Sequence, residues 1–132
     1  MTPTLHTARL SLRPLARAEA RVLAQIEAGT AMGWSVVPAG TDSIIGMVGL
    51  HHIDGTAPFA QIAYEIDGEY SGKGLATEAV ERVIEHARTE LGLLRLEAHI
   101  GPDNSRSIRL AERLGFVRES EVESTVVYTR TL

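Results

Sequence analysis

Cysteine is absent from the 132-residue chain. That absence excludes a disulfide framework, a thiolate nucleophile and a cysteine-based metal site, and it makes a reducing cytoplasm the expected compartment. Long hydrophobic runs are also lacking, because no apolar stretch approaches the ~18 residues of a membrane span. The first residues show neither the basic nor the apolar region of a secretory signal, so no signal peptide is expected.

Positive charge is in short supply, with 13 lysines and arginines against 17 aspartates and glutamates. The resulting net charge of -4 argues against a general nucleic-acid binder, which normally presents a basic face. It is compatible with a cationic substrate such as an amine. Hydrophobic residues at 44% and charged residues at 23% are typical of a folded protein, and the length suits a single domain over residues 1–132.

Hydrophobic periodicity predicts a mixed fold. Helical spacing predicts helices over residues 15–28, 75–91 and 103–114, each followed by a glycine that can end it. Alternation and turn residues predict strands. Those over residues 33–37, 44–53 and 60–67 should form an antiparallel meander, and the one over residues 94–100 should direct its leucines to the core. These strands cover residues 5–13, 33–37, 44–53, 60–67, 94–100 and, in the tail, 126–128. The order predicts an α/β (α+β) fold with helices on the faces of a mixed sheet.

A glycine-rich turn lies between a predicted strand and the strongest predicted helix. Gly72 and Gly74 leave the backbone open to a ligand, and the helix start supplies unpaired amides and a positive dipole, so this segment can cradle a phosphate. A plain strand-to-helix turn is the open alternative. A Walker A loop is excluded because Gly68 lies one residue too close to Gly72. The dinucleotide fingerprint is excluded because Thr77 stands where its third glycine belongs.

The segment from Tyr70 to Ala79 resembles the RimJ/RimL branch of the GNAT acetyltransferases, a branch named for N-terminal acetylation of ribosomal proteins. The family's pyrophosphate loop reads Gln/Arg-x-x-Gly-x-Gly/Ala, and here Ser71, Gly74 and Ala76 take its three defined positions. Residues 7–15, 45–50 and 95–116 match the branch in order and at the right spacing. The resemblance therefore covers nearly the whole chain, and it implies a mostly antiparallel central sheet flanked by helices.

The resemblance implies acetyl-CoA as co-substrate. The backbone of Tyr64, Glu65 and Ile66 would pair with the pantetheine arm as an added strand would. An amide near Ile66 would polarise the thioester carbonyl as an oxyanion hole, and Asn104 would contact the pantetheine side. The pyrophosphate would be held by the loop residues Ser71, Gly72, Lys73, Gly74, Leu75, Ala76 and Thr77.

In related enzymes the amine attacks the thioester directly, which requires a deprotonated amine and help for the leaving thiolate. Ser107 matches a cofactor-binding serine that in this branch can protonate the thiolate. The alternative is an ordinary serine in the first turn of a helix. A tyrosine acid used by other branches is excluded, because Ala111 occupies its position.

Two residues are candidate general bases. His99 lies on the polar face of its predicted strand and matches a glutamate base of a relative. Histidine as a residue type suits proton abstraction near neutral pH. Glu65 is the rival base, while Gln61 carries an amide that cannot act as one. The alternatives are an exposed surface histidine and a solvated strand face.

Two further groups of polar residues have a less specific interpretation. The cluster of Glu119, Glu121 and Glu123 either binds a cationic substrate or forms a solvated edge strand, which we favour. His51 and His52 are adjacent, so they point to opposite faces of a strand and no metal site is expected.

Only residues 29–32 separate the first predicted helix from the second strand, where RimJ/RimL-like chains carry a longer helical region that helps to wall the substrate. This shortening predicts an open acceptor site, or one completed by a partner subunit in a homodimer. The leading hypothesis is an N-acetyltransferase for a protein N-terminus or a small-molecule amine, without nucleic-acid or membrane partners. The alternatives are a weak or inactive acyl-CoA-binding module and a binder of another phosphate ligand.

Overall fold

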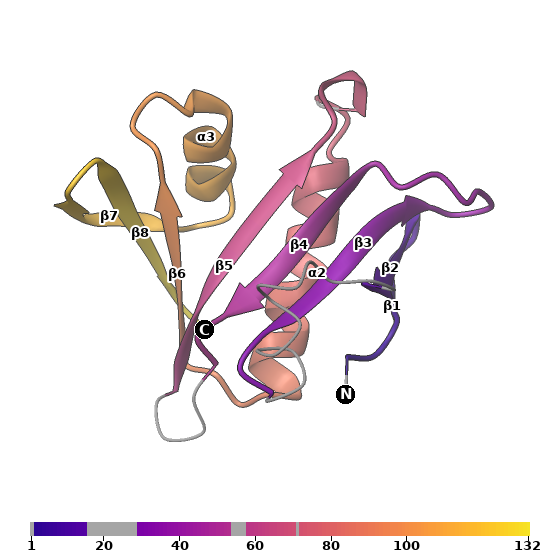
Figure 1. The fold of residues 1–132 in the computed structure, drawn as a ribbon, viewed down its shortest axis with the longest axis horizontal. Helices are drawn as coiled ribbons and strands as arrows, with labels where there is room; N and C mark the ends of the chain where they lie inside the picture. Colours follow the sequence, from indigo (N-terminus) through magenta and orange to yellow (C-terminus); the bar gives the residue numbers. More distant parts are fainter. Residues whose placement is uncertain (1, 16–28, 54–57, 71) are drawn as a thin grey trace.

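The computed structural model describes residues 2–15, 29–53, 58–70 and 72–132. Its strands form one eight-stranded sheet in the order β1-β2-β3-β4-β5-β6-β8-β7 (Figure 1). The strands are β1 (Leu5–His6), β2 (Leu10–Pro14), β3 (Met32–Pro38), β4 (Gly46–His51), β5 (Phe59–Ile66), β6 (Arg95–Ile100), β7 (Val117–Val122) and β8 (Thr125–Thr131). The helices are the short 3₁₀ turn η1 (Gly68–Tyr70), α2 (Leu75–Thr89) and α3 (Ser105–Arg113).

The predicted fold class is confirmed. Among the described strands, β5 and β6 form the one parallel pair and the other neighbours are antiparallel. The predicted helix over 15–28 lies mostly outside the described residues, as does Ser71. No helix within the described ranges is long and apolar enough to cross a membrane.

The prediction of one strand over residues 5–13 is wrong. The chain turns between β1 and β2, which lie side by side with Leu5 opposite Leu12. The turn forms because the Thr7 hydroxyl accepts hydrogen bonds from the amides of Arg9 and Leu10, at 3.3 and 3.0 Å. Such side-chain-to-backbone bonds compete with a continuous strand.

Helix α2 packs against the sheet and supplies much of the core. Its buried side chains include Ala79, Val80, Val83, Ile84 and Ala87, whose spacing puts them on one face of the helix. Figure 1 shows α2 lying behind the sheet at β3, β4 and β5. The apolar stripe in the sequence is therefore the face that meets the sheet.

One leucine of the fifth predicted strand is not in the core. Leu96 is fully buried, but Leu94 is 59% exposed and precedes β6. The amide of Leu94 donates instead to the carbonyl of Pro58, at 2.7 Å, as the chain enters the sheet. The alternating face begins only at Arg95, one residue later than predicted.

The sheet opens between its two parallel strands, and this opening positions the site. Pairing of β5 with β6 ends at Gln61 and Glu97. Beyond that point β5 pairs with β4 as far as Ile66, and β6 pairs with β8 as far as Ile100. Figure 1 shows the two strands diverging, with α3 beside the gap.

A buried histidine links α2 to β3. His86 is 6% exposed, and its ring meets that of the fully buried Trp34 edge-on, with centroids 5.8 Å apart. The Nε2 atom of His86 has no hydrogen-bond partner among the described residues. Burial, followed by the nearby charge of Arg82, lowers the pKa of His86, while Glu90 opposes this shift.

We predict that this histidine makes the fold sensitive to mild acid. In the unfolded chain His86 takes up a proton near pH 6.5, whereas in the folded chain its lowered pKa delays protonation. Stability should therefore fall as pH drops below about 6.5. His86→Phe, which cannot be protonated, should flatten this fall in denaturant titrations between pH 8 and pH 5. Parallel profiles for the parent and the variant would contradict the assignment.

Candidate functional site

A cavity of about 510 Å³ lies between the end of β5, the start of α2 and one side of α3. Its lining includes nine residues that the sequence placed at a cofactor site. These are Tyr64, Glu65, Ile66, Gly72, Gly74, Ala76, Thr77, Asn104 and Ser107. Tyr64 and Ser107, which are 43 positions apart along the chain, therefore meet around one space.

The floor of the cavity is formed by the glycine loop and the start of α2. Gly74 is the N-cap residue, with a left-handed φ of 77° that glycine adopts without strain. No side chain caps this end of the helix, so the amides of its first turn keep their hydrogen-bonding capacity. Together with the helix dipole they make a site suited to an anion.

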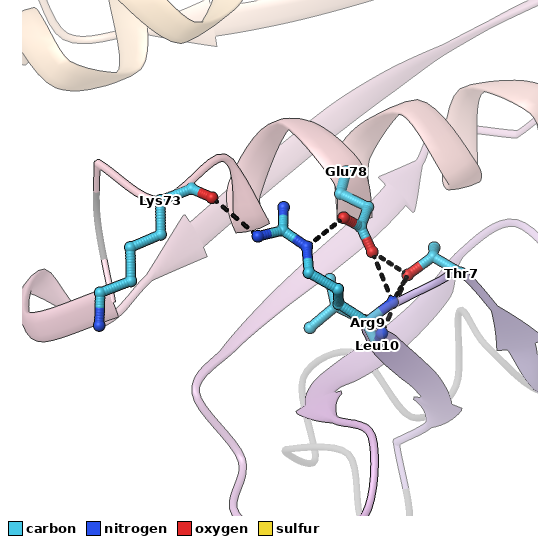
Figure 2. A network of polar contacts seen from close by, with 5 residues as sticks. All are labelled: Thr7, Arg9, Leu10, Lys73 and Glu78. Carbon is cyan, nitrogen blue, oxygen red and sulfur yellow. Dashed lines mark hydrogen bonds and ion pairs between the residues drawn. The ribbon is translucent and has the colours of Figure 1, made fainter.

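Two predicted loop residues do not line the cavity with their side chains. Leu75 packs into the core at 9% exposure. Lys73 is exposed, with its ammonium 5.6 Å from the centroid of the Tyr70 ring. The Lys73 carbonyl accepts a hydrogen bond from Arg9, which Figure 2 shows reaching across to the loop. Ser71 lies outside the described residues.

The wall opposite the loop carries three arginines that the sequence analysis did not single out. Arg106, Arg109 and Arg113 all line the cavity from α3. In the described part of the chain none of them forms an ion pair with a carboxylate, and Arg106 instead donates to the Ile66 carbonyl at 3.3 Å. Their spacing of three and four residues on a helix was the available signal.

The open edge of β5 presents backbone groups to the gap between β5 and β6. The Pro58 carbonyl accepts from the amides of Leu94 and Arg95, so it faces β6, whereas the Asp67 amide donates to Ile45 on the other side. Because a strand directs alternate residues to opposite edges, the N–H and C=O groups of Tyr64 and Ile66 face the gap. They lie beyond the end of the β5–β6 ladder. The Ile66 carbonyl accepts from Arg106, and the other groups are available to an extended ligand.

Tyr64 joins β5 to α3 across the cavity. Its hydroxyl donates to the Ser107 carbonyl at 3.0 Å. Burial raises the pKa of Tyr64 to about 12, so the hydroxyl stays protonated at neutral pH and keeps this bond. Asn104 caps α3, its Oδ1 accepting from the Ser107 amide at 3.2 Å. The Asn104 amide nitrogen remains free of this cap and can meet a ligand.

The candidate acid and the candidate bases lie on opposite sides of the sheet. Ser107 lies on α3. Gln61 and Glu97 are opposite one another in the sheet, and Glu65 and His99 share their face because alternate residues of a strand point the same way. This face is directed away from Tyr64 and the buried Leu96. Glu65 is nevertheless among the cavity-lining residues, whereas His99 is not. The gap between β5 and β6 is the opening that connects the two sides of the sheet.

His99 has a partner that the sequence analysis missed. Its Nε2 lies 3.1 Å from Oε1 of Glu97, and the other Glu97 oxygen accepts from Arg95 at 3.1 Å. Arg95 also pairs with Glu119 at 2.8 Å. Residues two apart on a strand share a face, so the spacing of Glu97 and His99 was the available signal.

The other polar groups are placed as follows. Glu119, Glu121 and Glu123 belong to the β7 hairpin, where β7 is the edge strand and all six of its residues are exposed. Within the described ranges, no group of three His, Asp or Glu residues is arranged to hold a metal ion.

Comparison with known proteins gives a consistent result. Residues 4–117 match the family model described as an acetyltransferase (GNAT) domain. The uncharacterized N-acetyltransferase p20 of Bacillus licheniformis is 38% identical over 91 residues, covering 69% of this chain and 51% of p20. The chain spans about half the length of the curated relatives that it matches most strongly.

Solved structures support the fold. The acetyltransferase from Agrobacterium tumefaciens strain C58 superposes with a TM-score of 0.82 at 24% identity, covering 98% of this chain and 95% of that one. RimJ of Mycobacterium smegmatis, in complex with CoA-disulfide, superposes with a TM-score of 0.74 at 20% identity, covering 91% and 68%. The fold that the resemblance implied is thus matched in three dimensions. Together with the family match over most of its length, this shows that the chain belongs to the GNAT acetyltransferase family.

Proposed function

We propose that residues 1–132 form one domain that transfers the acetyl group of acetyl-CoA to a primary amine. The observation that carries this proposal is the gap between β5 and β6, which connects an anion-binding cavity on one side of the sheet with His99 and Glu65 on the other. A thioester at the gap would be open to an amine from the side opposite its phosphates. Because the chain has no cysteine, we propose direct attack and a cytoplasmic location.

The cavity offers groups that suit each part of CoA. The first amides of α2 and the arginines of α3 complement the negative charge of the phosphates. The backbone of Tyr64 and Ile66 can pair with the amides of the pantetheine arm, as an added strand would. Asn104 can donate from its side-chain nitrogen on the same side.

The chemical step needs two proton transfers. The amine nitrogen attacks the thioester carbon, and the carbon–sulfur bond breaks, leaving a thiolate. We assign the proton that the thiolate takes up to the Ser107 hydroxyl, which lies at the cavity and regains a proton from solvent. We assign the proton lost by the amine to His99, with Glu97 stabilising the charged imidazole across their 3.1 Å contact. Glu65 remains the alternative base.

The acceptor side of the gap is acidic. Glu65 is exposed there, Glu97 lies on β6, and Glu119 lies on β7 and is joined to Glu97 through Arg95. This charge favours an amine that arrives as a cation, which fits both a protein N-terminus and a small-molecule amine. A second copy of the chain in a homodimer is our proposal for completing the wall of this side.

A binding module without turnover is the second candidate, favoured by the short segment from Gly29 to Met32. The two are separated by measuring, with the same preparation, CoA binding by calorimetry and acetyl transfer to a panel of polyamines, amino sugars and peptides with free N-termini. Binding without transfer to any acceptor would favour the module. Binding of ATP or NAD but not of CoA would exclude both.

We predict that Gly74→Ala weakens CoA binding at least tenfold while the protein still folds. An alanine at φ 77° is strained, and its Cβ would lie 3.3 Å from Nη2 of Arg9, so the Arg9 side chain that holds the loop must give way by a few tenths of an ångström. Gly40→Ala is the matched control, because Gly40 has a φ of 82° in open space far from the cavity along the chain. Both variants should lose about 1–2 kcal/mol of stability, but only Gly74→Ala should raise the Kd for CoA tenfold or more, a change of about 1.4 kcal/mol.

We predict that His99→Gln alters the pH dependence of acetyl transfer. If His99 accepts the amine proton, the variant should lose the rising limb of kcat/KM at acid pH, while Glu65→Gln keeps it. The reverse outcome would identify Glu65 as the base. Unchanged profiles in both variants would mean that the amine loses its proton to solvent, and that neither side chain is a base.

We predict that Ser107→Ala lowers kcat by about 10²–10⁴-fold, the range for loss of a general acid, with little change in CoA affinity. The Ser107 amide and carbonyl make the bonds to Asn104 and Tyr64, so the substitution leaves those bonds in place. Burst kinetics and calorimetry separate the two quantities. A parent-like kcat would remove Ser107 from the mechanism.

A further inference from the structure

Arg9 connects the turn between β1 and β2 to the glycine loop, 64 residues away along the chain. Its Nη1 donates to the Lys73 carbonyl at 3.0 Å, and its Nε donates to Oε1 of Glu78 at 2.7 Å. Figure 2 shows the guanidinium lying between these two acceptors. One side chain therefore holds the loop and the first turn of α2 at the same time.

Glu78 is held from two directions. Its Oε2 accepts from the Thr7 hydroxyl and from the Arg9 amide, the latter at 3.0 Å, while Arg9 Nε occupies the other oxygen. Burial alone would raise the pKa of Glu78, but hydrogen bonds from Thr7 and Arg9 and the charge of Arg9 together hold it below its usual range. The carboxylate is thus ionised and fully engaged on the β2 side of the helix.

An unpaired carboxylate in this place would oppose anion binding. Glu78 belongs to the first turn of α2, and its side chain is 21% exposed. A negative charge there interacts with the same positive helix end that would attract a phosphate. Pairing with Arg9 neutralises that charge and fixes it away from the cavity, whose lining includes Gly74, Ala76 and Thr77 but not Glu78.

The bond to Lys73 also sets the direction of the next amide. In a trans peptide the C=O of one residue and the N–H of the following residue point in opposite directions. With the Lys73 carbonyl held by Arg9, the Gly74 N–H points away from Arg9. Gly74 lines the cavity while Lys73 does not, so this orientation presents the amide toward an anion.

We propose that Arg9, acting with Thr7 and Glu78, is a positioning residue that holds the glycine loop in its phosphate-binding conformation without touching the ligand. This inference rests on the proposed function and deepens it. It assigns a role to the segment Thr7–Leu10, which matches the family but contributes no residue to the cavity. It also requires that the effect of Arg9 be confined to the phosphate-bearing part of the co-substrate.

The test compares two thioesters that differ in that part. Acetyl-CoA carries the pyrophosphate and nucleotide, whereas S-acetylpantetheine carries the same thioester arm without them. Arg9→Ala should raise KM for acetyl-CoA by about tenfold or more, the scale for losing hydrogen bonds to a charged group. Its kcat should change little, and its kcat/KM for S-acetylpantetheine should equal that of the parent.

Arg13→Ala is the matched control. Arg13 lies on β2, is 47% exposed against 51% for Arg9, and pairs with the exposed Asp42 at 3.3 Å, away from the loop. This variant should have the parent's KM for acetyl-CoA and the parent's kcat/KM for S-acetylpantetheine. Arg9→Lys should be intermediate, because a lysine keeps the charge but cannot reach two acceptors with a planar fork. Glu78→Gln, which keeps the shape of the side chain but not its charge, should also raise KM for acetyl-CoA and leave kcat/KM for S-acetylpantetheine unchanged.

Equal losses of kcat/KM for acetyl-CoA and S-acetylpantetheine in Arg9→Ala and Arg9→Lys would overturn the proposal, because Arg9 would then act on the fold as a whole. A parent-like KM of Arg9→Ala for acetyl-CoA would overturn the proposal as well. If the parent binds CoA but has no turnover, calorimetric Kd values for CoA replace KM, and an unchanged Kd in Arg9→Ala overturns the inference. Failure of the parent to bind CoA would instead show that the proposed function itself is wrong.

Discussion

The divergence of β5 and β6 after Gln61 and Glu97 is the constraint on which the site depends. Sheet ladders normally consume the hydrogen-bonding groups of neighbouring strands, and unpaired groups are costly unless water or a ligand satisfies them. Here the edge of β5 beyond Ile62 has no partner strand, and its Ile66 carbonyl accepts from Arg106. Helix α3 stands over the gap and is tied to β5 by the Tyr64–Ser107 bond. The same opening therefore provides a backbone surface for an extended ligand and a passage through the sheet.

The two sides of this passage differ in charge, although the whole chain is only mildly acidic. The helix side carries the start of α2 and three arginines without carboxylate partners among the described residues. The other side carries Glu65, Glu97 and Glu119, with Glu97 and Glu119 joined through Arg95. Such a division suits a reaction between an anionic donor and a cationic acceptor, because each is attracted to its own side.

Preorganisation of the loop follows from contacts outside the cavity. Gly72 and Gly74 have left-handed φ values of 76° and 77°. Glycine can adopt many other φ values as well, so these two residues do not by themselves fix the conformation of the loop. A flexible segment of this kind must be ordered by its surroundings if it is to bind without a large entropic cost. Arg9 supplies that order from the β1–β2 turn, where its side chain is held by Glu78 of α2, and neither residue lines the cavity.

The sequence by itself determined the features that depend on neighbouring residues. The apolar stripe of α2, the glycine turn before it and the Asn104 cap were all predictable, because periodicity, turn chemistry and capping act within a few residues. The cavity-lining positions of β5 and the loop were identified through ordered motifs. The tertiary structure alone decided the exposure of Leu94, the Arg9–Glu78 bond and the contact of the arginines with the cavity. Each of these depends on a partner far away along the chain, and a local pattern carries no information about which distant group will complete a hydrogen bond or cover an apolar surface.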